Sequence, residues 1–276
     1  MKILKIINSL EAGGAEKLVV DMAIEFHKNG IEVTLLLLNG IGTPLKKKLK
    51  SFPGIQLHSL TTGKNIYNPL LGLKLKSWLS NYDIIHVHLF PSSYWVALAN
   101  IISFKRHNII FTEHNTTNRR RSKPVFKIID RIIYKQFKSI VSISDAVDQS
   151  LKQHLGKNFS NIIKIHNGIH LETIEKAIPY PKKELGFIDS HKLILQVSSF
   201  TPQKDQITLI KALKHLPKSY IVLLVGDGPL IDKCKTIVKQ LNLETRVHFL
   251  GIRDDVPRLL KSVDTIILSS HYEGLS

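Results

Sequence analysis

The chain has 276 residues, and its content of 43% hydrophobic and 22% charged residues is that of a soluble globular protein with one large domain or two of ordinary size. No stretch approaches about 18 uninterrupted apolar residues, which excludes a membrane-spanning helix. A single cysteine, Cys234, excludes an internal disulfide and indicates a reducing compartment, so we expect a cytoplasmic protein. The net charge of +17 predicts a polyanionic partner, which is nucleic acid, an acidic membrane surface or a phosphate-bearing substrate.

Apolar strand-like runs alternate with helical patterns along the first part of the chain, which is typical of an α/β fold with parallel sheets covered by helices on both faces. The pattern predicts a strand over Lys2–Asn8, a helix over Ala15–Lys28 that is closed by Gly30, and a second strand over Glu32–Leu38. Further strands are predicted at Ile55–Leu57, Ile84–His88, Ile109–Thr112, Ile140–Ser142 and Ile162–Ile165.

A break in the apolar periodicity, carrying Pro179 and Pro181, predicts a linker over residues 173–190. Four more strands follow, at Leu193–Val197, Tyr220–Val225, Val247–Phe249 and Thr265–Leu268. We therefore predict two doubly wound parallel-sheet (Rossmann-like) domains, residues 1–172 and 191–276, with a cleft between them. Doubly wound domains usually have five or six strands, so we expect the second domain to be incomplete.

The segment from Leu195 to Lys204 predicts an anion site. A buried strand runs into small residues and Pro202, and one lysine, Lys204, then stands at the start of a helix predicted over Gln203–Leu216. Backbone N–H groups at a helix start and an ammonium group attract the same negative charge.

Glycine-containing loops follow several of the predicted strands. Gly13-Gly14 lies between the first strand and the first helix, where it admits a phosphate or a substrate to the backbone, or alternatively makes a tight turn. Gly226 and Gly228 have the same two interpretations after a later strand. The loop at Ile252-Arg253 suits the reading of a base through backbone groups.

Histidines mark two strand ends. His86 and His88 share one strand face, but no carboxylate or third histidine stands at recognisable ligand spacing, so the pattern disfavours a metal. His114 lies at a strand's carboxyl end beside Glu113 and Asn115, where the hydroxyls of a ligand could be read. No metal site is evident in the sequence.

A basic segment follows His114, with apolar residues on a second helical stripe. Four-residue spacing gives a basic amphipathic helix, which suits an anionic lipid surface or, alternatively, a solvated face packed on its own sheet. Few aromatic residues interleave with the basic ones, so nucleic acid is disfavoured as a partner. The basic residues are Arg119, Arg120, Arg121, Lys123, Lys127, Arg131 and Lys135, and the apolar ones are Phe126, Ile129, Ile133 and Phe137.

Taken in order, these motifs resemble family 4 of the retaining glycosyltransferases, which have the two-domain GT-B fold. The resemblance implies transfer of a sugar from a UDP- or GDP-linked donor to a glycan or lipid-linked acceptor with retention of anomeric configuration, without a metal or other cofactor. Together with this resemblance, the basic helix predicts an acceptor presented at a membrane, as in cell-surface polysaccharide synthesis, and a protein at the inner face of that membrane. The motifs are Gly13-Gly14, His114, Asn167-Gly168-Ile169, Lys204, Gly226-Asp227-Gly228-Pro229 and Glu273-Gly274-Leu275-Ser276.

The resemblance also implies roles for individual residues. Lys204 would neutralise the leaving diphosphate, Glu273 would hold the hydroxyls of the donor sugar, and His114 would contact the same sugar. Ser199 stands where the family pattern has an arginine, and one donor group aimed at developing charge contributes about 3 kcal/mol. The remaining donor-binding residues would be Gly13, Gly14, Gly226, Asp227, Gly228, Ile252, Arg253, Gly274, Leu275 and Ser276.

A second departure is that the family's second motif glutamate would fall beyond Ser276, so we expect the 276-residue chain to transfer sugar poorly. Two other classes stay open. A GT-B nucleotide-sugar epimerase shares the fold and the ligand but needs no acceptor. An inactive remnant would bind a sugar nucleotide or an anionic surface without turnover.

Overall fold

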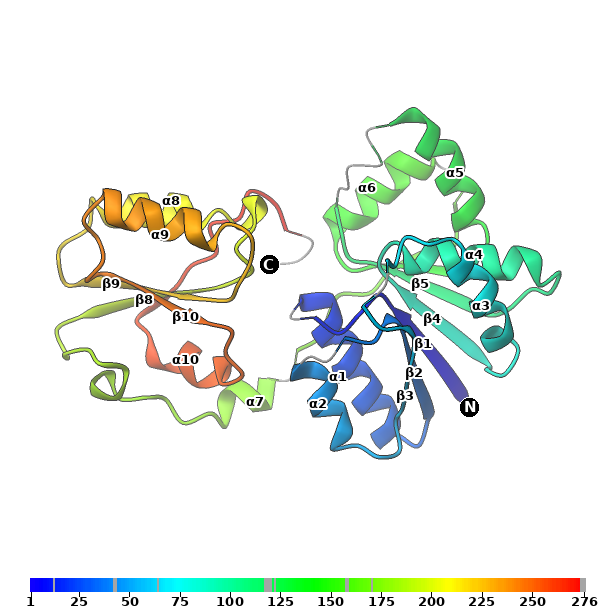
Figure 1. The fold of residues 1–276 in the computed structure, drawn as a ribbon, viewed down its shortest axis with the longest axis horizontal. Helices are drawn as coiled ribbons and strands as arrows, with labels where there is room; N and C mark the ends of the chain where they lie inside the picture. The colour runs from blue at the N-terminus through cyan, green and yellow to red at the C-terminus, as the bar shows by residue number, and fades with distance from the viewer. Residues whose placement is uncertain are drawn as a thin grey trace. The chain divides into compact units, whose positions relative to one another are not determined.

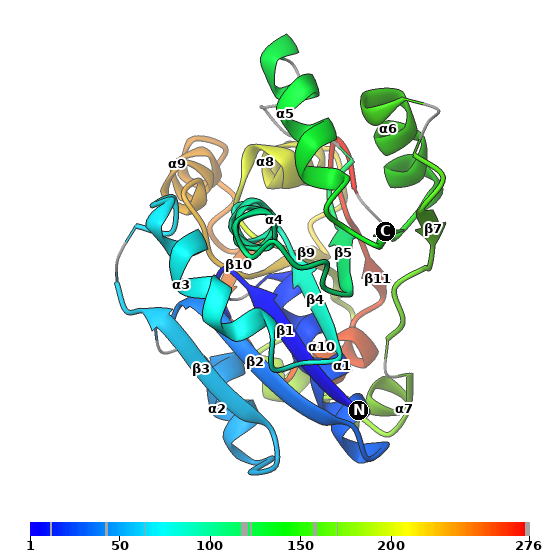
Figure 2. The same cartoon turned by 90° about the vertical axis from the view of Figure 1, so that its right-hand side faces the viewer.

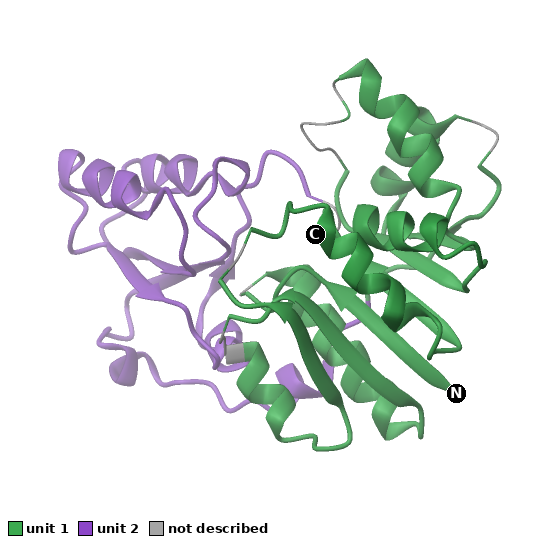
Figure 3. Cartoon of the chain, turned by 45° about the vertical axis from the view of Figure 1, so that its right-hand side comes forward, with its two compact units in different colours: residues 1–167, 274–276 green, residues 168–273 purple. Residues whose placement is uncertain are grey.

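The computed structural model describes residues 1–11, 13–41, 44–63, 65–116, 121, 123–156, 159–169 and 171–273. These residues form two compact units, Met1–Asn167 and Gly168–Glu273, which Figure 3 shows in different colours. Each unit has its own parallel sheet and its own hydrophobic cores. The α/β class with two parallel sheets, predicted from the alternation of strands and helices, is therefore confirmed.

The sheet of unit 1 contains seven parallel strands in the order β3-β2-β1-β4-β5-β6-β7 (Figure 2). The order reverses between β1 and β4, and in sheets of this kind ligands bind beyond the carboxyl ends of the strands at such a reversal. In the register of this pair, Lys5 lies beside His86. The strands are β1 (Lys2–Ile7), β2 (Glu32–Asn39), β3 (Gln56–Thr61), β4 (Ile84–His88), β5 (Ile109–Glu113), β6 (Ser139–Ser142) and β7 (Ile162–Lys164).

Helices cover both faces of this sheet, as parallel strands require. Local sequence sets several helix starts: Pro124 occupies the first turn of α5, and the hydroxyl of Ser144 caps α6 by accepting from the Val147 N–H. The helices are α1 (Gly14–Lys28), α2 (Pro44–Lys50), α3 (Leu70–Leu79), α4 (Ser92–Ile102), α5 (Pro124–Tyr134) and α6 (Asp145–Leu155).

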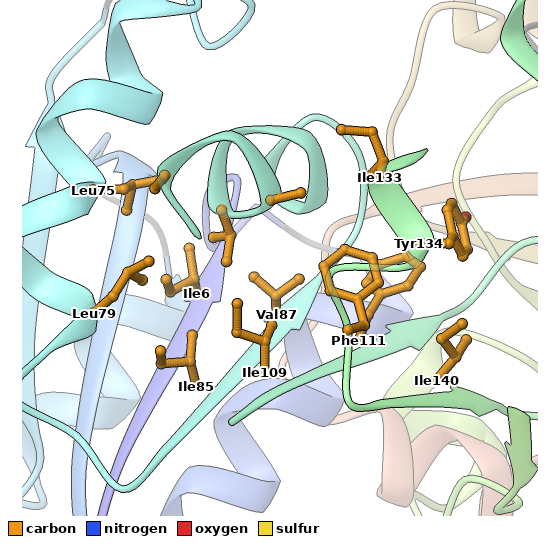
Figure 4. Close-up of a cluster of buried hydrophobic side chains, with 14 of the residues drawn as sticks. Ile6, Leu75, Leu79, Ile85, Val87, Ile109, Phe111, Ile133, Tyr134 and Ile140 are labelled. Carbon is orange, nitrogen blue, oxygen red and sulfur yellow. The ribbon is translucent and has the colours of Figure 1, made fainter. Parts of the chain in front are cut away.

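The two faces of the unit 1 sheet have separate cores. The larger core packs Ile85, Val87 and Phe111 against helices α3 to α6. Figure 4 shows Phe111 beside Tyr134, with 5.4 Å between the two ring centroids. The smaller core lies under α1 and α2. Because side chains alternate along a strand, Lys5, the partner of His86, points to the face opposite its neighbours Leu4 and Ile6.

Unit 2 contains four parallel strands in the order β10-β9-β8-β11. Its order reverses between β8 and β11, so the same rule places a ligand beyond the ends of these two strands. The strands are β8 (Lys192–Val197), β9 (Tyr220–Val225), β10 (Val247–Gly251) and β11 (Thr265–Ile266). The helices are α7 (Leu171–Glu175), α8 (Gln206–Leu213), α9 (Ile231–Gln240) and α10 (Val256–Ser262), with single 3₁₀ turns η1 (Lys182–Leu185) and η2 (Pro202–Lys204); Figure 1 shows their arrangement.

The segment expected as a linker, residues 173–190, groups with unit 2. Its Phe187 is buried in the core that also holds Leu195 and Leu223, and Tyr180 packs against the same cluster. Apolar residues at irregular spacing bury themselves in this segment without long helices or strands, so periodicity does not reveal them. None of the described helices is long and apolar enough to cross a membrane.

Candidate functional site

The turn that carries Lys204 lies at the strand-order reversal of unit 2. The helix predicted over Gln203–Leu216 is wrong at its start, because α8 begins at Gln206 and Lys204 ends a separate 3₁₀ turn. Asp205 separates the two with a left-handed backbone (φ 41°, ψ 50°), and its side chain accepts from the Thr208 N–H as the helix cap. The lysine is therefore held on a tight turn ahead of the helix.

Buried amide side chains hold this turn in place. Gln196, at the end of β8, donates to the Lys204 carbonyl at 2.9 Å, and Gln206 donates to the Ser199 carbonyl at 2.9 Å. Ser269, which follows β11, donates to the Asp205 carbonyl at 2.8 Å. Since Gln196 and Gln206 are fully buried, these bonds fix the backbone of the turn while the Lys204 side chain stays partly exposed.

Lys204 and Glu273 form an ion pair within unit 2. The Lys204 Nζ lies 2.6 and 2.7 Å from the two carboxylate oxygens of Glu273. The segment before Glu273 is tied to the same turn, because the His271 N–H donates to the Gln203 carbonyl and the Gln203 amide donates to the Tyr272 carbonyl. The structure thus brings together the two residues expected to act on the diphosphate and on the sugar. The expected donor-binding residues Gly274, Leu275 and Ser276 lie outside the described residues.

Gly226 and Gly228 bring the loop after β9 against the loop after β8. A Cβ on Gly226 would lie 2.1 Å from the Ser198 carbonyl oxygen, and one on Gly228 would lie 2.7 Å from the Phe200 carbonyl oxygen. Both glycines have positive φ, 131° and 154°. Close packing of the two loops accounts for both glycines. The carboxylate of Asp227 accepts from the Gly228 N–H at 2.7 Å.

The loop after β10 presents Ile252, which is exposed, and Arg253, which is paired. The Arg253 Nε donates to Asp255 at 2.8 Å, and this bond lowers the pKa of the Asp255 carboxyl. Asp255 also accepts from the Tyr180 hydroxyl at 2.6 Å. Ser199, where the family pattern has arginine, is exposed on the loop before the Lys204 turn.

A cluster of buried basic side chains lies at the strand-order reversal of unit 1. His86 Nδ1 is 3.2 Å from the Lys5 Nζ, and His86 Nε2 is 2.8 Å from the Thr112 hydroxyl. His88 Nδ1 lies 3.1 Å from Nε2 of His114, and the rings of His86 and His88 lie 4.1 Å apart between centroids, tilted by 39°. Lys5 and His88 are fully buried.

Burial sets the charge state of this cluster. Desolvation lowers the pKa of Lys5 to about 7. It also lowers the pKa of His114 to about 4, with a smaller contribution from the charge on Lys5, and takes the pKa of His86 and of His88 well below the usual value for histidine. The three imidazoles are therefore neutral near pH 7. Among the described residues, no group of three or more His, Cys, Asp or Glu side chains is arranged to hold a metal ion.

Gly13 and Gly14 stand at the start of α1, after the first strand of unit 1. Gly13 is the residue before the helix, and its N–H donates to the Glu11 carbonyl. The carboxylate of Glu16 lies directly beside Gly13, where a Cβ would come within 2.1 Å of it, and burial raises the pKa of this carboxyl. The Gly14 side of the loop is open.

The basic segment divides into a buried and an exposed part. The expectation that Arg121 belongs to a membrane or acceptor surface is wrong, because its side chain is only 8% exposed and donates to Glu113 at 2.6 Å. The guanidinium of Arg121 pairs with the buried carboxylate of Glu113. The four-residue spacing of the basic residues does not reveal this ion pair. Lys127, Arg131 and Lys135 are exposed on or directly after α5. Arg119 and Arg120 lie outside the described residues.

Sequence reasoning did not identify the residues that support the two sites. Lys5 stands between apolar residues in the interior of the first strand, and a charged residue there was the available signal for a buried polar cluster. Gln196 ends a buried strand in the same way. Nothing in the local sequence shows that Gln206 turns back onto the Lys204 loop, because that contact depends on the left-handed Asp205.

Two parallel α/β units, each with polar residues at its strand-order reversal, are the architecture of the GT-B glycosyltransferases. The family model for Glycosyltransferase Family 4 matches residues 12–173, and the model for Glycosyl transferases group 1 matches residues 180–276. The chain belongs to Glycosyltransferase Family 4.

Characterised relatives match nearly the whole chain. N-acetyl-alpha-D-glucosaminyl L-malate synthase of Bacillus anthracis is 26% identical over 95% of this chain and 71% of its own length. N-acetylgalactosamine-N,N'-diacetylbacillosaminyl-diphospho-undecaprenol 4-alpha-N-acetylgalactosaminyltransferase of Campylobacter jejuni is 26% identical over 98% of this chain and 74% of its own length. The crystal structure of Anabaena HepE with UDP and glucose has a TM-score of 0.82 at 23% identity, over 98% of this chain and 74% of that one.

Proposed function

We propose that the protein transfers a sugar from a nucleotide diphosphate sugar to a glycan or lipid-linked acceptor, with retention at the anomeric carbon and without a metal. The observation that carries this proposal is the Lys204 ammonium, held on a fixed turn at the strand-order reversal of unit 2, in a chain that belongs to a glycosyltransferase family. The Campylobacter jejuni relative, named an N-acetylgalactosaminyltransferase, and the Bacillus anthracis relative, named for the synthesis of N-acetyl-alpha-D-glucosaminyl L-malate, support the same reaction class.

During the reaction, negative charge develops on the leaving diphosphate. The bond between the anomeric carbon and the diphosphate oxygen breaks, the acceptor hydroxyl oxygen bonds to the same carbon, and its proton passes to the leaving group. Lys204 neutralises the charge that develops, because a preorganised cation needs no rearrangement at that moment. Ser199 supplies no second charge, so Lys204 carries more of this task than it would beside an arginine.

Glu273 and His114 bind the donor sugar in this proposal. Glu273 accepts hydrogen bonds from sugar hydroxyls, and a diphosphate that takes the Lys204 ammonium releases the carboxylate for this role. His114, neutral because of its burial, contacts a sugar oxygen without adding charge. The backbone of Gly13-Gly14 and the loop of Ile252-Arg253 complete the donor contacts, the first with the phosphates and the second with the base.

The test is a transfer assay with UDP- and GDP-linked hexoses and a lipid-linked or oligosaccharide acceptor, with the anomeric configuration of the product read by NMR. We expect a glycosylated acceptor whose new linkage has the donor's configuration. A changed sugar nucleotide in the absence of acceptor would show the epimerase instead. Saturable binding of the donor without any product would show the non-catalytic class.

We also propose that α5 holds the protein at an anionic membrane. Three apolar side chains of this helix, Val125, Ile128 and Ile132, are more than half exposed, and the cations of Lys127 and Arg131 lie on the same helix. Exposed apolar side chains beside basic ones match the boundary between acyl chains and anionic headgroups. The Campylobacter jejuni relative, named for a diphospho-undecaprenol substrate, is consistent with an acceptor at a membrane.

Sedimentation with vesicles tests this surface. We expect retention on vesicles that contain phosphatidylglycerol and loss of retention when Lys127, Arg131 and Lys135 are all changed to Glu. Ile128→Ser should weaken retention at every salt concentration, because it removes an apolar contact that salt does not screen. Retention unchanged by both variants would refute the membrane role of α5.

A further inference from the structure

His88 and His114 each have one ring nitrogen that takes no part in the hydrogen bond between them. His88 Nδ1 and His114 Nε2 lie 3.1 Å apart, so each ring uses one nitrogen in this bond. The second nitrogen of His88, Nε2, is buried and has no hydrogen-bond partner among the described residues. The second nitrogen of His114, Nδ1, is left for a ligand, because His114 is itself only partly buried.

Two proton arrangements satisfy a bond between neutral imidazoles, since one ring must donate and the other must accept. In the first, His88 donates from Nδ1, its Nε2 is a bare lone pair, and His114 carries its proton on Nδ1. In the second, His114 donates from Nε2, the buried His88 Nε2 carries an N–H, and the His114 Nδ1 is a bare lone pair. The two arrangements offer a ligand opposite groups.

The surroundings of His88 favour the first arrangement. A buried N–H without an acceptor is rarer in proteins than an acceptor without a donor. The charged neighbour of the cluster is the ammonium of Lys5, 3.2 Å from His86 Nδ1, and the centroid of the His86 ring lies 4.1 Å from that of His88. Within the part of the chain that the structure describes, the hydrogen-bond partners of the three histidines are Lys5, Thr112 and one another, and none is a carboxylate. A positive environment favours a lone pair over an N–H at the unpartnered nitrogen.

We infer that His88 fixes the tautomer of His114, so that His114 offers its Nδ1–H as a hydrogen-bond donor to an oxygen of the ligand. His88 is thus a positioning residue, and the inference rests on the proposed function only in taking that oxygen to belong to the donor sugar. The ligand group that fits is an acceptor oxygen, such as a hydroxyl that donates its own proton elsewhere.

The lowered pKa of His114 and the burial of His88 support this arrangement. A protonated His114 would donate from both nitrogens, which would leave the His88 Nδ1 as the acceptor and force an N–H onto the orphaned Nε2. Because burial keeps both rings neutral near pH 7, His114 keeps a single tautomer near this pH. The titratable groups that face His88 are His86, Lys5 and His114, and a positive charge on any of them would lower the pKa of His88 further, so each favours the neutral ring.

The experiment is nitrogen NMR of the ligand-free protein labelled with ¹⁵N-histidine, which distinguishes protonated from bare ring nitrogens. We expect protonated Nδ1 and bare Nε2 for both His88 and His114 at about pH 7. Protonated Nε2 on His114 would overturn the inference. Because this measurement uses wild-type protein without ligand, it stands whether or not the protein transfers sugar.

Three His88 variants then connect the tautomer with binding. His88→Asn keeps an amide donor near the Nδ1 position and should leave the His114 tautomer and the donor KM close to wild type. His88→Asp supplies an acceptor, so His114 should turn to the Nε2–H tautomer and the donor KM should rise about tenfold, the loss expected for one hydrogen bond. His88→Leu should give mixed tautomers and an intermediate KM.

The matched control is His86→Asn, on the same strand and also buried, which contacts Thr112 and Lys5 and makes no hydrogen bond to His114. It should leave the His114 tautomer unchanged. Equal effects of His86→Asn and His88→Asp on the tautomer would overturn the inference. A tautomer that follows the His88 variants while KM stays constant would retain the positioning by His88 and refute the sugar contact of His114.

Discussion

Both units have polar residues at the strand-order reversal of their sheet, but the charge states of these residues are set in different ways. In unit 1, burial lowers the pKa of Lys5 and of the three histidines, and no carboxylate among the described residues is hydrogen-bonded to them, so the imidazoles are neutral near pH 7. In unit 2, Lys204 and Glu273 are each about one fifth exposed and form an ion pair. Neutral imidazoles suit the recognition of uncharged hydroxyls, whereas an accessible ammonium suits a diphosphate.

The largest effect is expected from removing the charge of unit 2. Lys204→Ala should lower turnover at least a hundredfold, about 3 kcal/mol of transition-state stabilisation, because it removes the cation aimed at the leaving diphosphate. The measurement is kcat for transfer, with circular dichroism to establish folding. Lys211→Ala, a change of an exposed lysine on α8, is the matched control and should retain wild-type turnover. Equal turnover in Lys204→Ala and wild type would show that Lys204 does not stabilise the leaving diphosphate.

The packing between the loops after β8 and β9, beside Lys204, can be disrupted by a substitution that changes no charge. Gly226→Ala should lower the free energy of unfolding by about 2–3 kcal/mol, because φ is 131° and the new methyl would lie 2.1 Å from the Ser198 carbonyl oxygen. Denaturant unfolding measures the change. Gly168→Ala adds a methyl with no atom within 4 Å and should be close to neutral. A neutral Gly226→Ala would show that the two loops do not pack as described.

The buried amine of unit 1 predicts a dependence of stability on pH. Because burial lowers the pKa of Lys5 to about 7 from 10.5, the unfolded chain binds one more proton than the folded protein between these values. The free energy of unfolding should therefore rise with pH in this window, by up to about 1.4 kcal/mol per pH unit, and be flat below it.

The comparison with Lys5→Met isolates this contribution from other titrating groups. The variant should be more stable than wild type near pH 7, and the difference should shrink as the pH approaches 10. Denaturant unfolding at several pH values gives both curves. Parallel curves for the two proteins would show that Lys5 keeps an ordinary pKa in the folded state, and the contrast between the units would lose its physical basis.

The smallest effect concerns the ion pair of unit 2. Glu273→Gln keeps the shape of the side chain and removes the carboxylate that competes with a diphosphate for Lys204. UDP should bind a few-fold more tightly, by about 1 kcal/mol, while transfer falls because the sugar hydroxyls lose their acceptor. Weaker binding of UDP would mean that Glu273 supports the nucleotide site instead of competing with it.

The sequence was sufficient to predict the fold class and its strands, and insufficient to predict the contacts that support the candidate sites. Every predicted strand is present, because buried parallel strands are continuous apolar runs that local reading detects. The ion pair between Lys204 and Glu273, which are far apart in the chain, was not predicted from the motifs and is a finding of the structure. The helix start at Gln206 could not be predicted because the left-handed backbone of Asp205 has no signal in the sequence. The burial of Arg121 could not be predicted because its ion pair with Glu113 is a tertiary contact.

The central claim is that the Lys204 ammonium binds the diphosphate and that Glu273 competes for it. Calorimetric titration of wild type, Lys204→Ala and Glu273→Gln with UDP, and separately with GDP, tests this without any acceptor or turnover. With the nucleotide that binds wild type more tightly, we predict the affinity order Glu273→Gln above wild type above Lys204→Ala, with at least a tenfold loss in the last. Equal affinity of wild type and Lys204→Ala for that nucleotide would contradict the account.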